Sequence, residues 1–302
     1  MPEFPSDRGP RLATVVGMIL VTGATGTIGS EVVRQLAARG EKVRALTRDP
    51  DRAGVPAGVE AVRGDYHEPP TVEAALAGVS ALFAVAVLGP GDADADRRLV
   101  ELARAAGVRR VVKLSAIAVD DPAVGPAGLW HRGGEQAVRD SGLEWTILRP
   151  SSFDSNTLSW AEPIRAGEPV PDMTGSGVQG VVDPRDVSAV AVEALLSDGH
   201  AGRIYTLTGP ELLTAADQAA ALAAALGRPV GTVDLTPEEA RDLMARSGLS
   251  DTYVEGVLGG TAYVRAGGNA VVTDDVHRVL GRAARTYAEW ARDHTEAFGA
   301  AD

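Results

Sequence analysis

The chain is predicted to adopt an α/β fold, in which a Rossmann-like, doubly wound parallel sheet is followed by a smaller, mainly helical C-terminal lobe. The first observation is a series of short runs rich in Val, Ile and Leu, typical of strands covered on both faces. These runs lie at residues 18–22, 42–47, 59–63, 81–87, 110–115 and 144–148. The second observation is the amphipathic segments between them, at residues 28–38, 71–77, 94–106 and 130–141. This alternation predicts parallel strands joined by right-handed helical crossovers.

The pattern changes after Arg149-Pro150. A loop rich in Pro and Gly leads to a predicted helix at 186–196 and a predicted strand at 203–207. Thr214, Thr236 and residues 273–275 then supply the capping chemistry for three further helices. We therefore expect a flexible extension at residues 1–17, a Rossmann domain at 18–150, and a C-terminal lobe at 151–302 that is interleaved with the sheet domain.

Composition narrows the possible functions. The 302 residues include 41 acidic and 29 basic side chains, a net charge of −12 that disfavours nucleic-acid and anionic-membrane partners. Cysteine is absent, which excludes disulfides, thiolate catalysis and iron–sulfur clusters. The histidines lack metal-ligand spacing, so we expect no metal. No apolar run has the length of a membrane span, and the N-terminus lacks a signal-peptide core. We expect a cytoplasmic protein with a small-molecule partner; its oligomeric state is not predicted.

Glycines follow the first predicted strand at positions 23, 26 and 29 and open the first predicted helix. Gly23 permits a tight turn, Gly26 lets backbone N–H groups approach a pyrophosphate, and Gly29 allows close contact between helix and strand. The helix N-terminus adds a partial positive charge. The turn therefore predicts dinucleotide binding by residues 18–150, through a set that also includes Thr25, Thr27 and Ile28.

The end of the second strand indicates which dinucleotide binds. A carboxylate at this place grips the ribose hydroxyls of NAD, whereas Arg48 can pair with a 2′-phosphate. Asp49 follows and can partly offset that charge. We expect NADP(H) to be preferred, with NAD(H) possible; the alternative is that Arg48 is an exposed loop residue.

Asp65 and Tyr66 end the third strand. Asp65 can accept a hydrogen bond from an adenine amino group while the neighbouring backbone lines the ring. Equally, Asp65 can bond its own backbone in a turn.

Several segments together resemble the NmrA-like proteins, atypical members of the short-chain dehydrogenase/reductase superfamily, and most closely the bacterial NAD(P)H quinone reductases and azoreductase-type proteins. They are residues 23–29 (Gly-Ala-Thr-Gly-Thr-Ile-Gly), Thr47-Arg48, Gly64-Asp65-Tyr66 and residues 141–150, which end in Leu-Arg-Pro. The resemblance runs from about residue 18 to 298. It implies a ligand cleft between the two parts, with a substrate-binding C-terminal lobe. It also implies that loops after three strands line the nicotinamide and substrate. Those loops hold Ala84, Val85, Ala86, Ser115, Ile117, Pro150, Ser151 and Phe153.

The usual catalytic pair of short-chain dehydrogenases is missing. None of the five tyrosines has a lysine four residues later, and the two lysines, Lys42 and Lys113, both fall in predicted strands. Resemblance to the quinone-reductase-like relatives instead singles out His131 and Glu135, an i, i+4 pair on the predicted helix. A histidine of near-neutral pKa can donate a proton to an acceptor oxygen. Gly133-Gly134 predicts a looser turn around it; the alternative is an exposed or capping histidine.

Quinones and other electron-poor acceptors take hydride with little help, so a strong cofactor site with weak catalytic residues suits them. Phe153, Trp130 and Trp160 can form an aromatic wall for a flat substrate, or they can be core residues. We therefore expect an NAD(P)H-dependent oxidoreductase acting on a small planar acceptor, a quinone, azo compound or activated enone. The alternatives are a non-catalytic, dinucleotide-sensing regulator of the NmrA type, with a protein partner, and a biosynthetic tailoring reductase or isomerase.

Overall fold

The computed structural model describes residues 17–86 and 94–299, with the side chains of residues 126–129 excepted. All but the last residue of the expected extension, residues 1–17, therefore lie outside the described part of the chain, as does Val87 at the end of the expected fourth strand.

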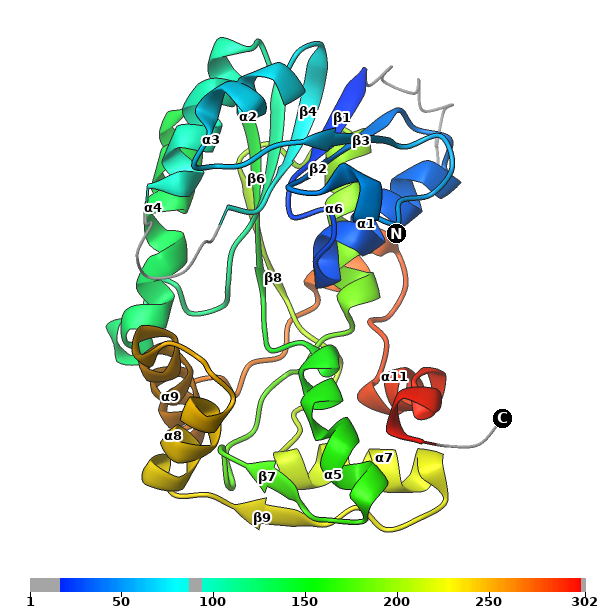
Figure 1. Cartoon of the computed structure of the whole chain (residues 1–302), viewed down its shortest axis with the longest axis vertical. Helices are drawn as coiled ribbons and strands as arrows, with labels where there is room; N and C mark the ends of the chain where they lie inside the picture. The colour runs from blue at the N-terminus through cyan, green and yellow to red at the C-terminus, as the bar shows by residue number, and fades with distance from the viewer. Residues whose placement is uncertain (1–16, 87–93, 300–302) are drawn as a thin grey trace, which may run out of the picture.

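The described residues form a seven-stranded, wholly parallel sheet in the order β3-β2-β1-β4-β5-β6-β8 (Figure 1). The order reverses between β1 and β4, which is where doubly wound sheets bind ligands beyond the carboxyl ends of their strands. The predicted Rossmann-like fold is confirmed. The strands are β1 (Met18–Val21), β2 (Val43–Thr47), β3 (Glu60–Arg63), β4 (Val79–Ala84), β5 (Arg110–Leu114), β6 (Glu144–Pro150) and β8 (Arg203–Leu207).

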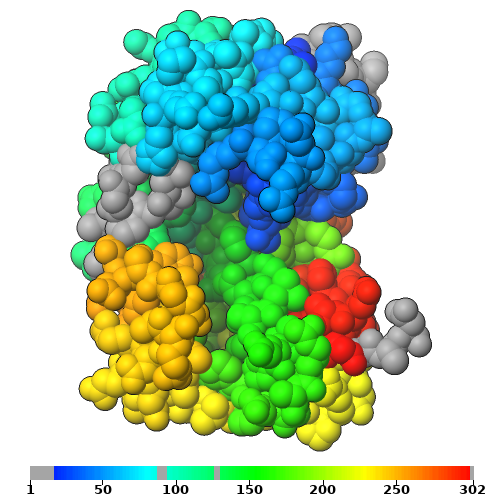
Figure 2. Space-filling model, viewed as in Figure 1, coloured from blue at the N-terminus to red at the C-terminus, as the bar shows by residue number. Residues whose placement is uncertain are grey.

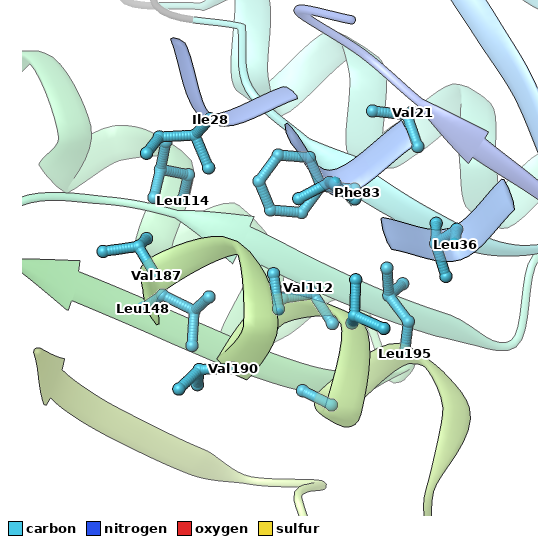
Figure 3. Close-up of a cluster of buried hydrophobic side chains, with 14 of the residues drawn as sticks. Val21, Ile28, Leu36, Phe83, Val112, Leu114, Leu148, Val187, Val190 and Leu195 are labelled. Carbon is cyan, nitrogen blue, oxygen red and sulfur yellow. The ribbon is translucent and has the colours of Figure 1, made fainter. Parts of the chain in front are cut away.

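Helices cover both faces of the sheet. On one face lie α1 (Thr27–Ala38) and α6 (Pro184–Leu196), and on the other α2 (Pro69–Ala75), α3 (Ala95–Ala105) and α4 (Pro126–Asp140) (Figure 1). Successive strand residues point to opposite faces. Val21 therefore packs beneath α1 and α6, whereas Leu20 joins the other core. Figure 3 shows the first core, where α1 and α6 meet the strands through Ile28, Leu36, Phe83, Val112, Leu114, Leu148, Val187, Val190 and Leu195.

The C-terminal part does not form one separate block. After β6 the chain builds the lower lobe, returns to the sheet as α6 and β8, and then goes back to the lobe (Figure 1). The lobe has its own apolar core, which includes Trp160, Tyr287 and Trp290. Its elements are α5 (Ala161–Ala166), α7 (Ala215–Leu226), α8 (Pro237–Arg246), α9 (Asp251–Arg265), α11 (Tyr287–Asp293) and a two-stranded parallel sheet of β7 (Val170–Asp172) and β9 (Thr232–Asp234). Helix α10 (Asp275–Leu280) instead packs against α6 and β8, and its Val276 joins the core beneath α1 and α6. Short 3-10 turns are η1 (Pro50–Arg52), η2 (Pro122–Val124), η3 (Asp154–Trp160) and η4 (Thr295–Phe298).

Two of the three predicted helix caps are confirmed. Thr214 and Thr236 form reciprocal capping boxes at the starts of α7 and α8. Thr273 is not a cap, because its hydroxyl instead donates to the carbonyl of Thr206 and ties the chain to β8. Helices α5, α9 and α11 and strands β7 and β9 were not predicted, since they are short or, in α9, interrupted by glycines that blur the apolar period.

The fourth strand differs from its predicted bounds of 81–87. It begins earlier, at Val79, which pairs with Met18, and it ends at Ala84. The side chain of Thr22 marks this end, because its hydroxyl donates to the carbonyl of Phe83 and accepts the N–H of Val85. Beyond Ala84, hydrogen bonds of the Thr22 side chain therefore continue the contact that the backbone makes between β1 and β4.

Within residues 17–86 and 94–299, no helix combines the length and the apolar character needed to cross a bilayer.

Candidate active site

The glycine turn between β1 and α1 has the geometry that its sequence predicts. Gly23 has a φ of +61°, in the region that favours glycine. A Cβ on Gly29 would stand 2.1 Å from the carbonyl oxygen of Gly23, so the helix can approach the strand only without a side chain there. The N–H of Gly26 closes the turn by donating to the same carbonyl at 2.9 Å.

The first turn of α1 is open to an anion. Its N-cap is Gly26, which has no side chain to cap the helix, and the turn contains no acidic residue. Thr25 and Thr27 are exposed beside it, whereas the Ile28 side chain is buried in the core and leaves only its backbone to the site. Uncapped N–H groups at the positive end of a helix dipole suit a pyrophosphate.

Arg48 is exposed just after β2. Among the described residues, none forms an ion pair or hydrogen bond with its guanidinium. The adjacent Asp49 turns its backbone N–H toward the hydroxyl of Thr47, at 3.3 Å. A free guanidinium at this strand end is available for a phosphate.

Asp65 and Tyr66 are held by the protein itself. The Oδ1 of Asp65 accepts the N–H of His67 at 2.9 Å, so the turn interpretation is confirmed for that oxygen. The Tyr66 hydroxyl donates to the carbonyl of Val85 at 2.8 Å, and burial raises the pKa of this phenol. Tyr66 thus anchors the loop after β4 through its side chain.

That loop, Ala84 to Ala86, is fixed from two sides. The hydroxyl of Thr22, the residue after β1, accepts the N–H of Val85, and the N–H of Ala86 donates to Oδ1 of Asp96 at 3.1 Å. The other carboxylate oxygen of Asp96 pairs with the ammonium of Lys113 at 3.0 Å, and both side chains are almost completely buried. Lys113 also donates to the carbonyl of Leu114.

This buried ion pair explains part of the Gly133-Gly134 sequence. A Cβ on Gly134 would lie 2.3 Å from the Asp96 carboxylate, so only glycine lets α4 pass over the pair. The expected looser turn is wrong: α4 runs without interruption from Pro126 to Asp140.

His131 sits on α4 near the same lysine. Burial, with a smaller contribution from the Lys113 ammonium, lowers the pKa of His131 to about 3. Its Nδ1 is buried and has no hydrogen-bond partner among the described residues. The expected near-neutral pKa is therefore wrong, and the imidazole is uncharged at neutral pH.

Glu135 is not paired with His131. Its Oε1 accepts the Ser115 hydroxyl at 2.5 Å and the Arg149 Nε at 2.9 Å, while its Oε2 accepts Arg149 at 2.6 Å and Arg139 at 2.7 Å. A carboxylate so fully engaged serves to join α4 to the ends of β5 and β6. Arg149 of the Leu-Arg-Pro block therefore has a structural role, because its guanidinium binds both carboxylate oxygens of Glu135.

The remaining predicted loop residues lie where β5 and β6 end. Ser115 bonds to Leu148 through its N–H, and Ile117 donates to the carbonyl of Pro150 at 2.9 Å. Ser151 donates to Leu207 on β8 at 2.9 Å. The two strand ends therefore form one rigid shelf.

A cavity of about 580 Å³ opens next to this shelf, between the end of the sheet and the lower lobe. Figure 2 shows the surface hollowed between the blue and cyan upper part and the green and orange lower part. Ile117, Phe153 and Trp160 line the cavity. Trp130 does not line it but stacks at 6.2 Å on Tyr253, which does. Two of the three expected aromatic residues therefore face the cavity directly.

The polar part of the cavity was not predicted. Gln179 accepts the Ser152 hydroxyl at 2.6 Å, and buried Asn269 donates to the Ser151 hydroxyl at 3.1 Å. Asn269 follows α9 and Gln179 follows β7, so only the return of the chain brings them to β6. Asp96 and Lys113 were also missed as a pair, although a lysine inside an otherwise apolar strand was a visible signal.

The acids at the start of α6 are paired with arginines. Asp183 caps α6 and binds Arg185 and Arg285, and Asp186 binds Arg282. Asp154 differs, because both of its buried carboxylate oxygens lack a partner among the described residues. Burial, then Asp183 and Asp186, raises the pKa of Asp154 to about 8.

The chain is similar to several known proteins in sequence and in structure. A sequence model of the NAD(P)H-binding family matches residues 23–198. The chain is 45% identical to the (4-alkanoyl-5-oxo-2,5-dihydrofuran-3-yl)methyl phosphate reductase of Streptomyces griseus, over 93% of this chain and 99% of that one. It is 40% identical to the NAD(P)H azoreductase of Xenophilus azovorans, over 94% and 100%. The NADPH complex of the Escherichia coli quinone oxidoreductase superposes with a TM-score of 0.81 at 26% identity, over 91% and 99%.

Proposed function

Because the chain belongs to the NAD(P)H-binding family and is an NAD(P)H-dependent oxidoreductase, we propose that it prefers NADPH and reduces a small planar acceptor. The acceptor is a quinone, an azo compound or an activated enone. The observation that carries this proposal is the position of the cavity of about 580 Å³ beside Ile117 and Phe153, which follow β5 and β6 at the same edge of the sheet at which the glycine turn follows β1.

The residues present fit the dinucleotide. The turn from Gly23 to Gly29 and the uncapped start of α1 would hold the pyrophosphate, and Arg48 would hold the 2′-phosphate. The turn at Asp65 uses only Oδ1 of its carboxylate, so Oδ2 can accept a hydrogen bond from the adenine amino group. When bound, NADPH supplies the hydride. The fixed loops at Ala84–Ala86 and Ser115–Ile117 would keep the nicotinamide end rigid.

The cavity suits a flat acceptor. Phe153 and Trp160 provide aromatic walls, and Ile117 adds apolar surface. Holding donor and acceptor in contact in a partly dry site can by itself account for a large rate enhancement.

Proton delivery does not use a charged histidine. With a pKa of about 3, His131 holds no excess proton at neutral pH and can act only as a neutral hydrogen-bonding group. Glu135 is engaged by two arginines and a serine. The reduced acceptor is a conjugated anion, so water entering the open side of the cavity can protonate it.

The test is oxidation of NADPH and NADH by the purified protein with a panel of quinones, azo dyes and enones. We expect turnover with at least one planar acceptor and a lower KM for NADPH. Tight binding of NADP⁺ with no acceptor reduced above background would overturn the proposal and favour a dinucleotide sensor.

A further inference from the structure

We infer that Gln179 binds the acceptor directly. Its side-chain Nε2 donates a hydrogen bond to the atom of the acceptor, a carbonyl oxygen or an azo nitrogen, that gains negative charge when hydride is added. This inference rests on the proposed function and assigns a substrate-binding residue to the same site. Gln179 lies in the wall of the cavity, and four observations lead to this role.

The backbone of Gln179 is fixed on two sides. Gln179 and Leu213 exchange N–H···O bonds of 3.0 Å in both directions. Three residues further on, the N–H of Val182 donates to the carbonyl of Ser152 at 2.9 Å and joins the same segment to the loop after β6. The side chain of Gln179 therefore starts from a rigid position at the edge of the cavity.

The amide oxygen of Gln179 is fully used inside the protein. Its Oε1 accepts the Ser152 hydroxyl at 2.6 Å and Nδ2 of Asn269 at 3.4 Å. An amide oxygen has two lone pairs, so these two donors occupy it. The shorter distance falls within the range of O–H···O bonds and below that of N–H···O bonds, which identifies Oε1 as the atom that faces Ser152.

The amide nitrogen of Gln179 has no such partner. Gln179 is only 8% exposed, and Nε2 forms no hydrogen bond with any described residue. It is nevertheless not sealed from open space, as the unpartnered oxygens of Asp154 are, and the open space beside Gln179 is the cavity. Buried donors are almost always paired with protein, water or ligand, so this N–H is available to a bound molecule.

The other amides in the wall are less suited to this role. Asn269 and Gln218 donate their amide N–H groups within the protein. Asn156 is exposed, so water can satisfy its amide. Among the described residues that line the cavity, Gln179 therefore combines a buried amide, a fixed orientation and a free donor.

The chemistry of the reaction gives this donor a purpose. Hydride forms a new C–H bond on the acceptor, the conjugated electron pair moves to the oxygen or azo nitrogen, and water then protonates that atom. A neutral donor that is already in position binds this atom more strongly as its negative charge grows, and so lowers the barrier without giving up a proton. Such help suits a site in which His131 is uncharged and Glu135 is engaged.

The first test is kinetic. Gln179→Met keeps the length of the side chain and removes the donor. With NADPH and 1,4-naphthoquinone we expect kcat to fall by at least about 10-fold, with a smaller change in KM and an unchanged Kd for NADPH, because the bond strengthens in the transition state.

Gln218→Met is the matched control. It makes the same substitution in the same wall, at an amide that donates to the carbonyl of Thr214 at 3.3 Å. Its loss of kcat should be much smaller. Equal losses in the two variants, or a kcat of Gln179→Met within about threefold of the parent value, would overturn the inference.

Infrared spectroscopy detects the hydrogen bond itself. The probe is 1,4-naphthoquinone with ¹³C-labelled carbonyl groups, bound at saturation to the NADP⁺ complex, where no hydride is available. A hydrogen bond lowers the stretching frequency of a carbonyl group. We expect one carbonyl band at lowered frequency in the parent protein and in Gln218→Met, and its loss in Gln179→Met. The same band in the parent and in Gln179→Met would overturn the inference even where kcat falls.

A second variant guards against loss of the fold. Gln179→Glu keeps an oxygen that can accept from Ser152 and Asn269, but it replaces the donor with a second oxygen. At pH of about 8, where a glutamate carboxyl is ordinarily ionised, it should lose the lowered carbonyl band as Gln179→Met does. A band that persists in Gln179→Glu at this pH would also contradict the proposed contact.

Failure of the proposed function can be told apart from failure of this inference. If no acceptor in the panel is reduced while NADPH still binds, the proposed function is wrong. The infrared spectra of the NADP⁺ complex then decide alone: a lowered carbonyl band that Gln179→Met abolishes supports the contact, and identical spectra or no bound quinone reject it.

Discussion

The charge and the hydrogen bonds of the side chains in this site depend on the residues packed around them. His131 is uncharged at neutral pH because it is buried near the Lys113 ammonium, and Glu135 is committed to Arg149 and Ser115. The sequence placed both on one helix face, which is correct. It did not predict that one would be neutral and the other saturated, because residues distant in sequence cause both effects.

The proposed contact of Arg48 with the 2′-phosphate makes a prediction at the residue scale. Arg48→Ala should weaken NADPH binding by at least about 10-fold and leave NADH binding unchanged, since one charge-assisted contact to a phosphate is worth roughly 1.5–3 kcal/mol. Dissociation constants from fluorescence titration measure this. Arg52→Ala, at an exposed arginine four residues on, is the matched control and should change neither constant. Equal weakening of both coenzymes by Arg48→Ala would refute the assignment.

The depressed pKa of His131 predicts the pH dependence of turnover. The histidine stays neutral above pH of about 4, so kcat/KM should show no inflection from it between about pH 5 and 8, where an ordinary histidine titrates. His131→Gln keeps a neutral hydrogen-bonding side chain and should retain the same flat profile. An inflection near the ordinary histidine value that disappears in the variant would show that the imidazolium takes part.

At the scale of elements, glycine positions decide how closely helices approach. The sequence identified the role of Gly29 in α1, because the motif around it is local and its geometry recurs. Gly134 was predicted to loosen the helix at this point, which is wrong, because α4 continues through it. The reason for Gly134 is the Asp96–Lys113 ion pair beneath it, which is formed by α3 and β5.

Two adjacent glycines allow a matched test of this packing. Gly134→Ala should lower the free energy of unfolding by roughly 1–3 kcal/mol, because the new methyl group would displace the Asp96 carboxylate. Gly133→Ala, at an exposed position of the same helix, should raise it by up to about 1 kcal/mol. Urea denaturation of both variants measures the difference. Similar effects of the two substitutions would contradict the packing argument.

On the scale of the whole molecule, the two parts of the chain are joined through charged residues. Asp183 and Asp186 at the start of α6 bind arginines from the C-terminal segment, while Asp154 at the start of η3 stays near them without a cation of its own. The charged form of Asp154 is therefore unfavourable at this contact between the sheet and the lobe.

Asp154 makes stability depend on pH with a defined sign. Its pKa is about 8 when folded and near 3.8 in its ordinary state, so between these values the folded protein holds a proton that the unfolded chain has released. The free energy of unfolding contributed by this group therefore falls as pH rises from about 4 to about 8. Asp154→Asn should raise the Tm at pH of about 8 by ~3 °C or more and have little effect near pH of about 4.

Thermal unfolding across this pH range measures the effect. Asp51→Asn, at an exposed aspartate, removes the same charge and should leave the pH dependence of the Tm unchanged. A Tm difference between Asp154→Asn and the parent protein that stays constant with pH would contradict the raised pKa.

Local patterns in the chain were sufficient for the alternation of strands and helices in the sheet domain, the glycine turn and the position of Arg48 at a strand end, because each depends on residues close in sequence. The cavity, the charge states of His131 and Asp154, and the Asp96–Lys113 pair were decided only when the chain folded. Burial and charge depend on which distant segments meet. Asn269 reaches the end of β6 across more than a hundred residues, and no periodicity in the sequence records that contact.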